Sequence, residues 1–189
     1  MKKVILFLVI MLILSNCSSV SPGQAFPLGK SIQNSLLAKK SNDVKCDEYY
    51  TYLETADSIL TKYNTKMTGK MLADAWHSTL ENFGVDVPVT LALAQAHLES
   101  GFCRSELSRQ KNNPYSLRSG KSYAKYSSLQ QGIDSYYKLI AKNYLSCKNI
   151  EQLLNNFSTC DGYRYAGSRN YEIKLKSQIK EYNLTLAKN

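Results

Sequence analysis

The chain has 189 residues, which suits one modest domain with a targeting segment rather than several domains. It carries 24 Lys and Arg residues against 15 Asp and Glu residues, a formal net charge of +9, and so favours anionic partners such as polymers or lipid head groups. Nucleic acid is not expected, because neither a basic helix stripe nor a recognisable nucleic-acid-binding motif accompanies the charge.

The N-terminus has the pattern of an export signal. Lys2 and Lys3 precede an apolar run over residues 4–14, which is short for a membrane span and typical of a signal peptide. The run ends in Leu14-Ser15-Asn16-Cys17, which resembles a bacterial lipobox, where the cysteine becomes the lipidated first residue. We therefore predict a signal over residues 1–17 and a lipoprotein anchored by Cys17 in the cell envelope, at the periplasm or the outer membrane. Secretion after cleavage behind Ala25 is the alternative.

Residues 18–45 are rich in serine, glycine and proline, and we interpret them as a flexible tether. The folded domain is predicted from residue 46 to residue 189. Apolar residues there recur at spacings of three and four, which is typical of amphipathic helices. The expected helices cover residues 46–63, 68–83, 86–100, 129–145, 150–157 and 170–182.

Local signals mark the ends of these helices. Gly84 and Gly101 are natural C-terminal stops, and Asp86 and Pro88 are candidates for the cap and first turn of the third helix. Residues 115–117 and 122–126 could pair as a hairpin across Ser119-Gly120. The predicted fold is a mainly helical domain with one small β-hairpin.

Removal of Cys17 leaves an even number of cysteines in an oxidising compartment, which favours disulfides. Cys147 and Cys160 would close a short loop and are the favoured pair, leaving Cys46 with Cys103. Buried thiols are the alternative. No metal site is predicted, because the chain has no C-x-x-C motif and its two histidines lack ligand-like spacing.

Glu99 is the first candidate for chemistry. It falls in the last turn of the third helix, on the face that also carries Ala92, Gln95 and Ala96. Partial burial would raise its pKa, as a general acid requires, and the negative field at the helix C-terminus acts in the same direction. Periodicity alone favours a plainer role as a surface or capping glutamate.

The surrounding sequence changes that balance. Residues 92–102, followed by Ser105, resemble the signature of the glucosaminidase domains of glycoside hydrolase family 73, in the lysozyme-like superfamily. Three further matches follow in the family's order. They are Asn112-Asn113-Pro114-Tyr115-Ser116-Leu117, Tyr126-Ser127-Ser128-Leu129, and Tyr165-Ala166 followed by Tyr171 and a last amphipathic helix.

The resemblance implies roles for individual residues. Glu99 matches the glutamate that protonates the leaving glycosidic oxygen, and Tyr165 matches a tyrosine near the scissile sugar. Predicted substrate contacts are Gln95, Asn112, Asn113, Tyr115, Tyr126 and Tyr171. The implied protein is a lysozyme-like peptidoglycan hydrolase, an endo-β-N-acetylglucosaminidase that needs no cofactor and acts as a monomer.

One stretch of sequence refines the expected mechanism. No Asp or Glu occurs between Glu106 and Asp134, so the hairpin cannot supply a second carboxylate. We therefore hypothesise that the substrate's own 2-acetamido group assists Glu99. A lytic transglycosylase, a muramidase and a non-catalytic peptidoglycan-binding lipoprotein are the alternatives.

Overall fold

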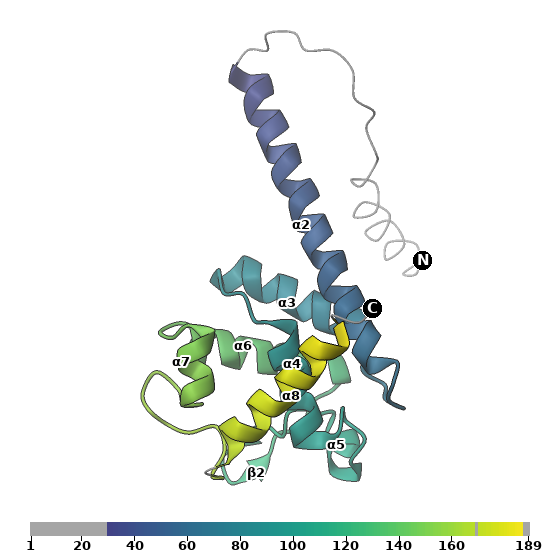
Figure 1. The fold of residues 1–189 in the computed structure, drawn as a ribbon, viewed down its shortest axis with the longest axis vertical. Helices are drawn as coiled ribbons and strands as arrows, with labels where there is room; N and C mark the ends of the chain where they lie inside the picture. The colour runs from purple at the N-terminus through teal and green to yellow at the C-terminus, as the bar shows by residue number, and fades with distance from the viewer. Residues whose placement is uncertain (1–29, 169, 187–189) are drawn as a thin grey trace, which may run out of the picture. The chain divides into compact units, whose positions relative to one another are not determined.

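The computed structural model describes residues 30–168 and 170–186, and Cys17 lies outside this range. The chain divides into two units, residues 1–49 and 50–189. The described residues are mainly helical with one two-stranded antiparallel sheet (Figure 1), so the predicted fold class is confirmed. The elements are α2 (Lys30–Leu60), α3 (Gly69–Phe83), α4 (Val89–Ser100), α5 (Glu106–Lys111), β1 (Arg118–Ser119), β2 (Ser122–Tyr123), α6 (Leu129–Ile140), η1 (Ala141–Leu145), α7 (Ile150–Asn155) and α8 (Tyr171–Leu186).

The first described helix overlaps the predicted tether. Helix α2 begins at Lys30, so residues 30–45 are helical, whereas residues 18–29 lie outside the described range. The physical reason is composition, because the second half of the segment contains the helix formers Leu, Ala, Lys and Gln. None of the helices in residues 30–168 and 170–186 combines the length and apolar character needed to span a membrane.

The helix ends follow their local signals with one exception. Thr68 accepts a hydrogen bond from the Met71 amide at 3.2 Å, and Gly84 ends α3 with a φ of 63°. Gly101 ends α4 in the same left-handed conformation, with a φ of 60°. Asp86, in contrast, does not cap α4. Its carboxylate instead accepts a hydrogen bond from the Trp76 indole at 2.8 Å.

Helix α4 forms the centre of the core. Its residues 91–96 are buried on every side, as expected for a helix enclosed by others rather than one lying on a surface. Helix α8 packs along α4, and α3 packs on α6 (Figure 1). Glu99 therefore belongs to the most enclosed helix of the domain, one residue before its end.

The hairpin forms where the sequence predicts it, although its strands are shorter than expected. Arg118 pairs with Tyr123, and Ser119 pairs with Ser122 across a turn in which Gly120 has a φ of 61°. The short helix α5, which precedes this lobe, was not predicted. Six residues are too few for a periodic pattern to stand out.

Helix α6 approaches the start of the hairpin lobe very closely. A Cβ atom on Gly132 would lie 2.0 Å from the backbone carbonyl oxygen of Asn112. Any residue larger than glycine would therefore force the two segments apart. The glycine fixes how near α6 stands to the loop behind Glu99.

Candidate active site

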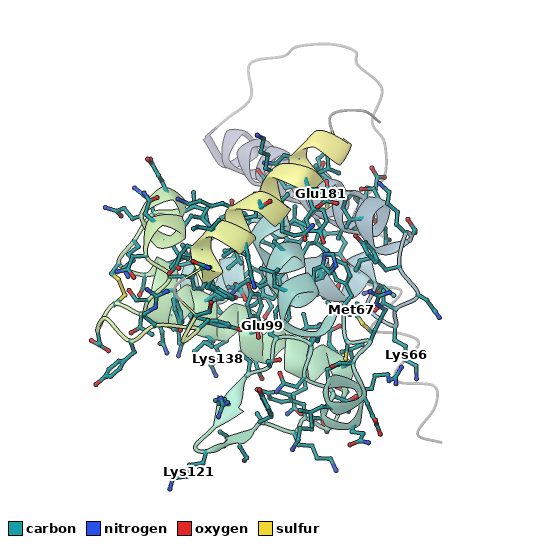
Figure 2. The ribbon with its side chains drawn as sticks, turned by 60° about the horizontal axis from the view of Figure 1, so that its bottom comes forward. Lys66, Met67, Glu99, Lys121, Lys138 and Glu181 are labelled. Carbon is teal, nitrogen blue, oxygen red and sulfur yellow. A yellow bond between two sulfur atoms is a disulfide. The ribbon has the colours of Figure 1, made fainter. Side chains whose placement is uncertain are left out.

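Glu99 lies at the end of α4, between α8 and the hairpin lobe (Figure 2). Its side chain is partly buried, and this desolvation raises the pKa of its carboxyl group. Hydrogen bonds from Tyr171 and Ser116 lower the same pKa, but burial is the larger effect. Glu99 is thus a carboxyl group that holds its proton to higher pH than a free glutamate, as a general acid requires.

The loop after α5 is fastened against the end of α4. Ser116 has a φ of 53°, and its hydroxyl donates a hydrogen bond to the Glu99 backbone carbonyl at 3.2 Å. Asn113 organises the loop from within. Its amide donates to the carbonyls of Leu117 at 2.8 Å and Ala124 at 3.0 Å, and its carbonyl accepts from the Leu117 amide. A buried asparagine therefore holds part of the base of the hairpin.

Ser100 makes a second connection between α4 and this loop. Its hydroxyl donates to the Pro114 carbonyl at 2.6 Å and accepts from the Cys103 amide at 2.7 Å. Because Ser100 follows Glu99 directly, these bonds fix the backbone that carries the carboxylate. The Gly101 turn and the hairpin lobe are joined through this one hydroxyl.

A pocket of about 130 Å³ opens beside Glu99, on the side of α5 and the hairpin. Most of its lining side chains are polar, and none apart from Glu99 is acidic. The lining residues are Glu99, Ser105, Leu107, Ser108, Lys111, Asn113, Ser116 and Tyr123.

On its other side, Glu99 ends a chain of buried hydrogen bonds. The Tyr136 hydroxyl donates to the Gln95 side-chain carbonyl, and the Gln95 amide donates to the Tyr171 hydroxyl at 2.9 Å. Tyr171 in turn hydrogen-bonds the Glu99 carboxyl group. Since Gln95 directs an N–H at the Tyr171 oxygen, the Tyr171 proton is left to face Glu99. The chain orients the carboxyl group from inside the protein.

Burial is the main cause that raises the pKa of the Tyr165 phenol, and the neighbouring Tyr171 and Glu99 raise it further. The Tyr165 hydroxyl donates to the Tyr115 backbone carbonyl at 2.8 Å, and its ring lies 5.7 Å from that of Tyr171. The ring of Tyr115 stacks on Tyr136 with centroids 3.5 Å apart. Tyr165 therefore joins the C-terminal loop to the segment that contacts Glu99.

A model of one protein family matches the sequence across these same elements. The family is described as "Mannosyl-glycoprotein endo-beta-N-acetylglucosaminidase", and the match covers residues 74–184, more than half of the chain. The chain belongs to the glucosaminidase family. This membership supports glycan hydrolysis as the activity class. No individual curated protein matches the sequence.

The structure separates the predicted substrate contacts of this glucosaminidase into two groups. The side chains of Gln95, Asn113 and Tyr115 are at most 2% exposed. Asn113 nevertheless lines the pocket beside Glu99, and the predicted contacts of these three residues with sugar stay predictions. Tyr171 is also buried, at 7% exposed, although it touches Glu99.

Asn112 and Tyr126 form the second group. They are partly exposed and contact each other, because the Asn112 amide donates to the Tyr126 carbonyl at 3.1 Å. Their predicted contact with sugar stays a prediction.

The acidic residues that border the hairpin lobe are engaged elsewhere. Glu106 accepts a hydrogen bond from Gln110 at 3.0 Å, and Asp134 accepts one from Gln130 at 2.8 Å. The pKa of Glu99 is shifted by burial and by hydrogen bonds from two hydroxyls, and no carboxylate is among the causes. In the part of the chain that the structure describes, no cluster of His, Cys, Asp and Glu side chains could hold a metal ion.

Glu172, which follows Tyr171 on α8, is a further carboxylate that no motif in the sequence marks as functional. Arg164 donates to both of its oxygens, at 2.8 and 2.9 Å, and the Phe157 amide donates at 3.1 Å. Burial alone would raise the pKa of Glu172, but these hydrogen bonds and the Arg164 charge lower it overall. The lowered pKa keeps Glu172 ionised, and its hydrogen bonds with Arg164 hold the Tyr165 loop against α8. The pKa of Glu99 is shifted in the opposite direction, upward.

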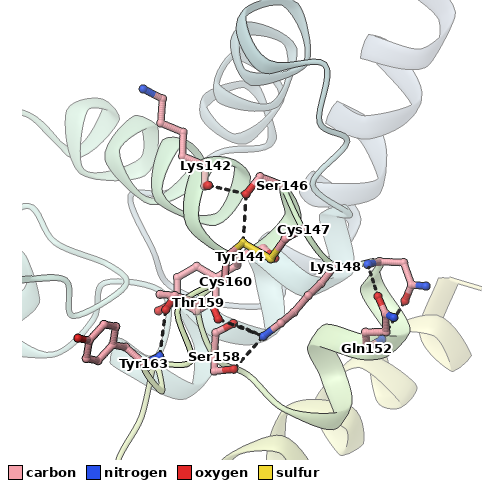
Figure 3. Close-up of a disulfide and its surroundings, with 11 residues drawn as sticks. Lys142, Tyr144, Ser146, Cys147, Lys148, Gln152, Ser158, Thr159, Cys160 and Tyr163 are labelled. Carbon is pink, nitrogen blue, oxygen red and sulfur yellow. Dashed lines mark hydrogen bonds between the residues drawn. A yellow bond between two sulfur atoms is a disulfide. The ribbon is translucent and has the colours of Figure 1, made fainter.

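The same loop is fixed at its start by the Cys147–Cys160 disulfide, the pair that the sequence favoured (Figure 3). Lys148 adds to this by donating to the Ser158 and Thr159 carbonyls at 2.7 and 3.2 Å. The second predicted disulfide, Cys46–Cys103, is wrong in this structure, because Cys103 is a free thiol. The Cys103 side chain is buried just after the Gly101 turn, and burial raises the pKa of its thiol.

Proposed function

We propose that this glucosaminidase is an endo-β-N-acetylglucosaminidase that cuts peptidoglycan glycan strands after N-acetylglucosamine, with Glu99 as its general acid. The observation that carries the proposal is the environment of Glu99. Its carboxyl group is desolvated, raised in pKa, oriented by Tyr171 and open to a polar pocket. These are the properties that proton donation to a glycosidic oxygen requires.

The proposed reaction has two steps. Glu99 gives its proton to the glycosidic oxygen as the C1–O bond breaks, while the 2-acetamido carbonyl oxygen of the same sugar attacks C1 and forms an oxazolinium ion. The Glu99 carboxylate then takes a proton from water, whose oxygen attacks C1 and reopens the ring. Each proton passes through one residue, so no second enzyme carboxylate is needed.

The position of the other acids supports this substrate-assisted route. The hairpin lobe contains no Asp or Glu, and the carboxylates of Glu106 and Asp134 already accept hydrogen bonds from glutamines on their own helices. Glu172 is ion-paired with Arg164. We therefore expect Glu106→Gln and Asp134→Asn to retain turnover. Loss of turnover as complete as that of Glu99→Gln, in folded proteins, would contradict the route.

The deciding experiment is digestion of purified peptidoglycan by the wild type and by Glu99→Gln, followed by mass spectrometry of the fragments. Reducing N-acetylglucosamine ends from the wild type alone support the proposal. Ends carrying 1,6-anhydro-muramic acid would indicate a lytic transglycosylase, and reducing muramic acid would indicate a muramidase. Equal cleavage by both proteins would remove Glu99 from its role, and binding without cleavage would indicate a non-catalytic wall-binding protein.

Such an enzyme would act outside the cytoplasm, where peptidoglycan lies. We propose that Cys17, the lipobox cysteine, is lipidated and anchors the mature chain to a membrane. Mass spectrometry of the mature N-terminus tests this directly. A lipid-modified Cys17 supports an anchored lipoprotein, whereas an unmodified N-terminus at residue 26 would indicate secretion.

A further inference from the structure

The hairpin lobe carries a strong, one-sided charge. We call residues 107–133 the cationic lobe. This segment contains five basic residues and no acidic one, and the basic residues are Arg109, Lys111, Arg118, Lys121 and Lys125. A stretch of this length with one sign of charge creates a local positive field that attracts anions.

The charges of the lobe are not neutralised within the described part of the chain. Salt bridges among the described residues join Lys70 to Asp74, His77 to Glu81 and Arg164 to Glu172, and none of these three involves a basic residue of the lobe. Four of the five basic side chains are exposed, those of Arg109, Arg118, Lys121 and Lys125. A partner outside this part of the chain can therefore reach them.

The hairpin holds its arginine in a defined position. The Arg118 guanidinium lies 4.9 Å above the centre of the Tyr123 ring on the paired strand, and it donates to the Lys121 carbonyl at 3.3 Å. Lys121 itself occupies the turn, at the tip of the lobe (Figure 2). Because Arg118 is already oriented, it loses less conformational entropy when it binds an anion.

The positive charge continues to the catalytic pocket. Tyr123, whose ring lies beneath Arg118, lines the pocket together with Glu99. Lys111 lines it as well, and its ammonium group donates to the Tyr123 carbonyl at 3.3 Å. A glycan bound with its scissile bond at Glu99 would therefore carry its neighbouring substituents along a row of cations.

We propose that the cationic lobe binds the carboxylates of the stem peptides on the muramic acid residues beside the scissile bond. The inference rests on the proposed function. Once its lactyl group is joined to the peptide, the glycan backbone is uncharged, so the peptide carboxylates are the anions that a peptidoglycan strand presents there. A membrane is a weaker fit, since of the large exposed apolar side chains in the described chain only Leu107 belongs to the lobe.

The test compares two triple variants of the full chain. One replaces Arg118, Lys121 and Lys125 with Gln. The matched control replaces three exposed lysines outside the lobe, Lys62, Lys174 and Lys180, and so changes net charge equally. Each protein is assayed on peptide-bearing peptidoglycan and on the same glycan after an amidase has removed its stem peptides.

On the peptide-bearing glycan, we expect the lobe variant to lose about tenfold or more in kcat/KM through a higher KM. Each exposed contact contributes roughly two- to fivefold. On the stripped glycan it should match the wild type, and the control should match the wild type on both. Equal loss on both substrates, equal loss in the control, or no loss would overturn the proposal.

A binding measurement keeps this result separate from the proposed function. Co-sedimentation with insoluble peptidoglycan is repeated with the lobe and control substitutions in a Glu99→Gln background, so cleavage is not needed. If no protein cuts glycan, the proposed function fails, while weaker sedimentation of the lobe variant still supports the surface. If instead the lobe substitutions abolish binding only to vesicles containing anionic lipid, the surface binds membranes and the proposal is wrong.

Discussion

Removal of the Cys147–Cys160 disulfide should destabilise the unit formed by residues 50–189 by a predictable amount. The two cysteines are 13 residues apart, and the chain-entropy relation for a loop of that size gives about 3 kcal/mol at 25 °C. A unit of this size loses roughly 3 °C in Tm for each kcal/mol. The double variant Cys147→Ser, Cys160→Ser should therefore melt about 10 °C below the wild type.

The assay is thermal and urea unfolding of the wild type and the double variant, each with and without a reductant. Reductant should lower the wild-type Tm to that of the variant and leave the variant unchanged. A loss in the free energy of unfolding well under 1 kcal/mol would refute the reasoning. It would mean that other contacts already restrict the loop in the unfolded chain as well as in the folded one. Lys148→Met separates those contacts, since it removes three hydrogen bonds to the same loop and leaves the disulfide in place.

Three further predictions concern the site itself. The free energy of unfolding of Glu99→Gln, measured in urea relative to that of the wild type, should rise as the pH increases from about 4.5 through the raised pKa of Glu99. The reason is that the wild type then buries a charge. A difference that does not change with pH would contradict this. Tyr171→Phe removes a hydrogen bond that lowers the Glu99 pKa, so the alkaline limb of a kcat/KM profile should move to higher pH, and a shift to lower pH would count against the assignment. Gly132→Ala should cost roughly 1–3 kcal/mol and reduce activity, because its Cβ would meet the Asn112 carbonyl at 2.0 Å. Gly167→Ala, which meets nothing within 4 Å, is the matched control, and equal losses in both would weaken the packing argument.

Local signals account for most of the fold that could be predicted. Thr68, Gly84 and Gly101 act through hydrogen bonds and φ angles within a few residues of themselves, so their effect is visible in the sequence. The hairpin at Ser119-Gly120 and the short disulfide loop are equally local. Asp86 was misassigned because its partner, Trp76, is brought to it only when α3 and α4 pack together.

Only part of the candidate site could be predicted from the sequence, because its other contacts also form only when distant segments pack together. The motif around Glu99 singled out that residue, and its raised pKa was expected from its position in an apolar helix. Gln95 and Asn113, however, are polar residues in the same motifs, and nothing local in the sequence shows that their side chains are buried. Their burial depends on Tyr136 and on the folded loop, and the ion pair between Arg164 and Glu172 likewise forms only after the chain closes on itself.

The π-helix η1 gives the site an unusual dependence on residue count. Its five residues follow α6 without a break, and they end just before Cys147. If the same five residues formed an ordinary α-helix instead, everything after them would turn by up to about 100°, the rotation of one α-helical residue. Tyr144, whose ring lies 5.9 Å from that of Tyr165, would then point away from its neighbour, and Cys147 would no longer face Cys160. The angular register of the loop beside Glu99 is therefore set by a single extra residue in a helix that never touches the carboxylate.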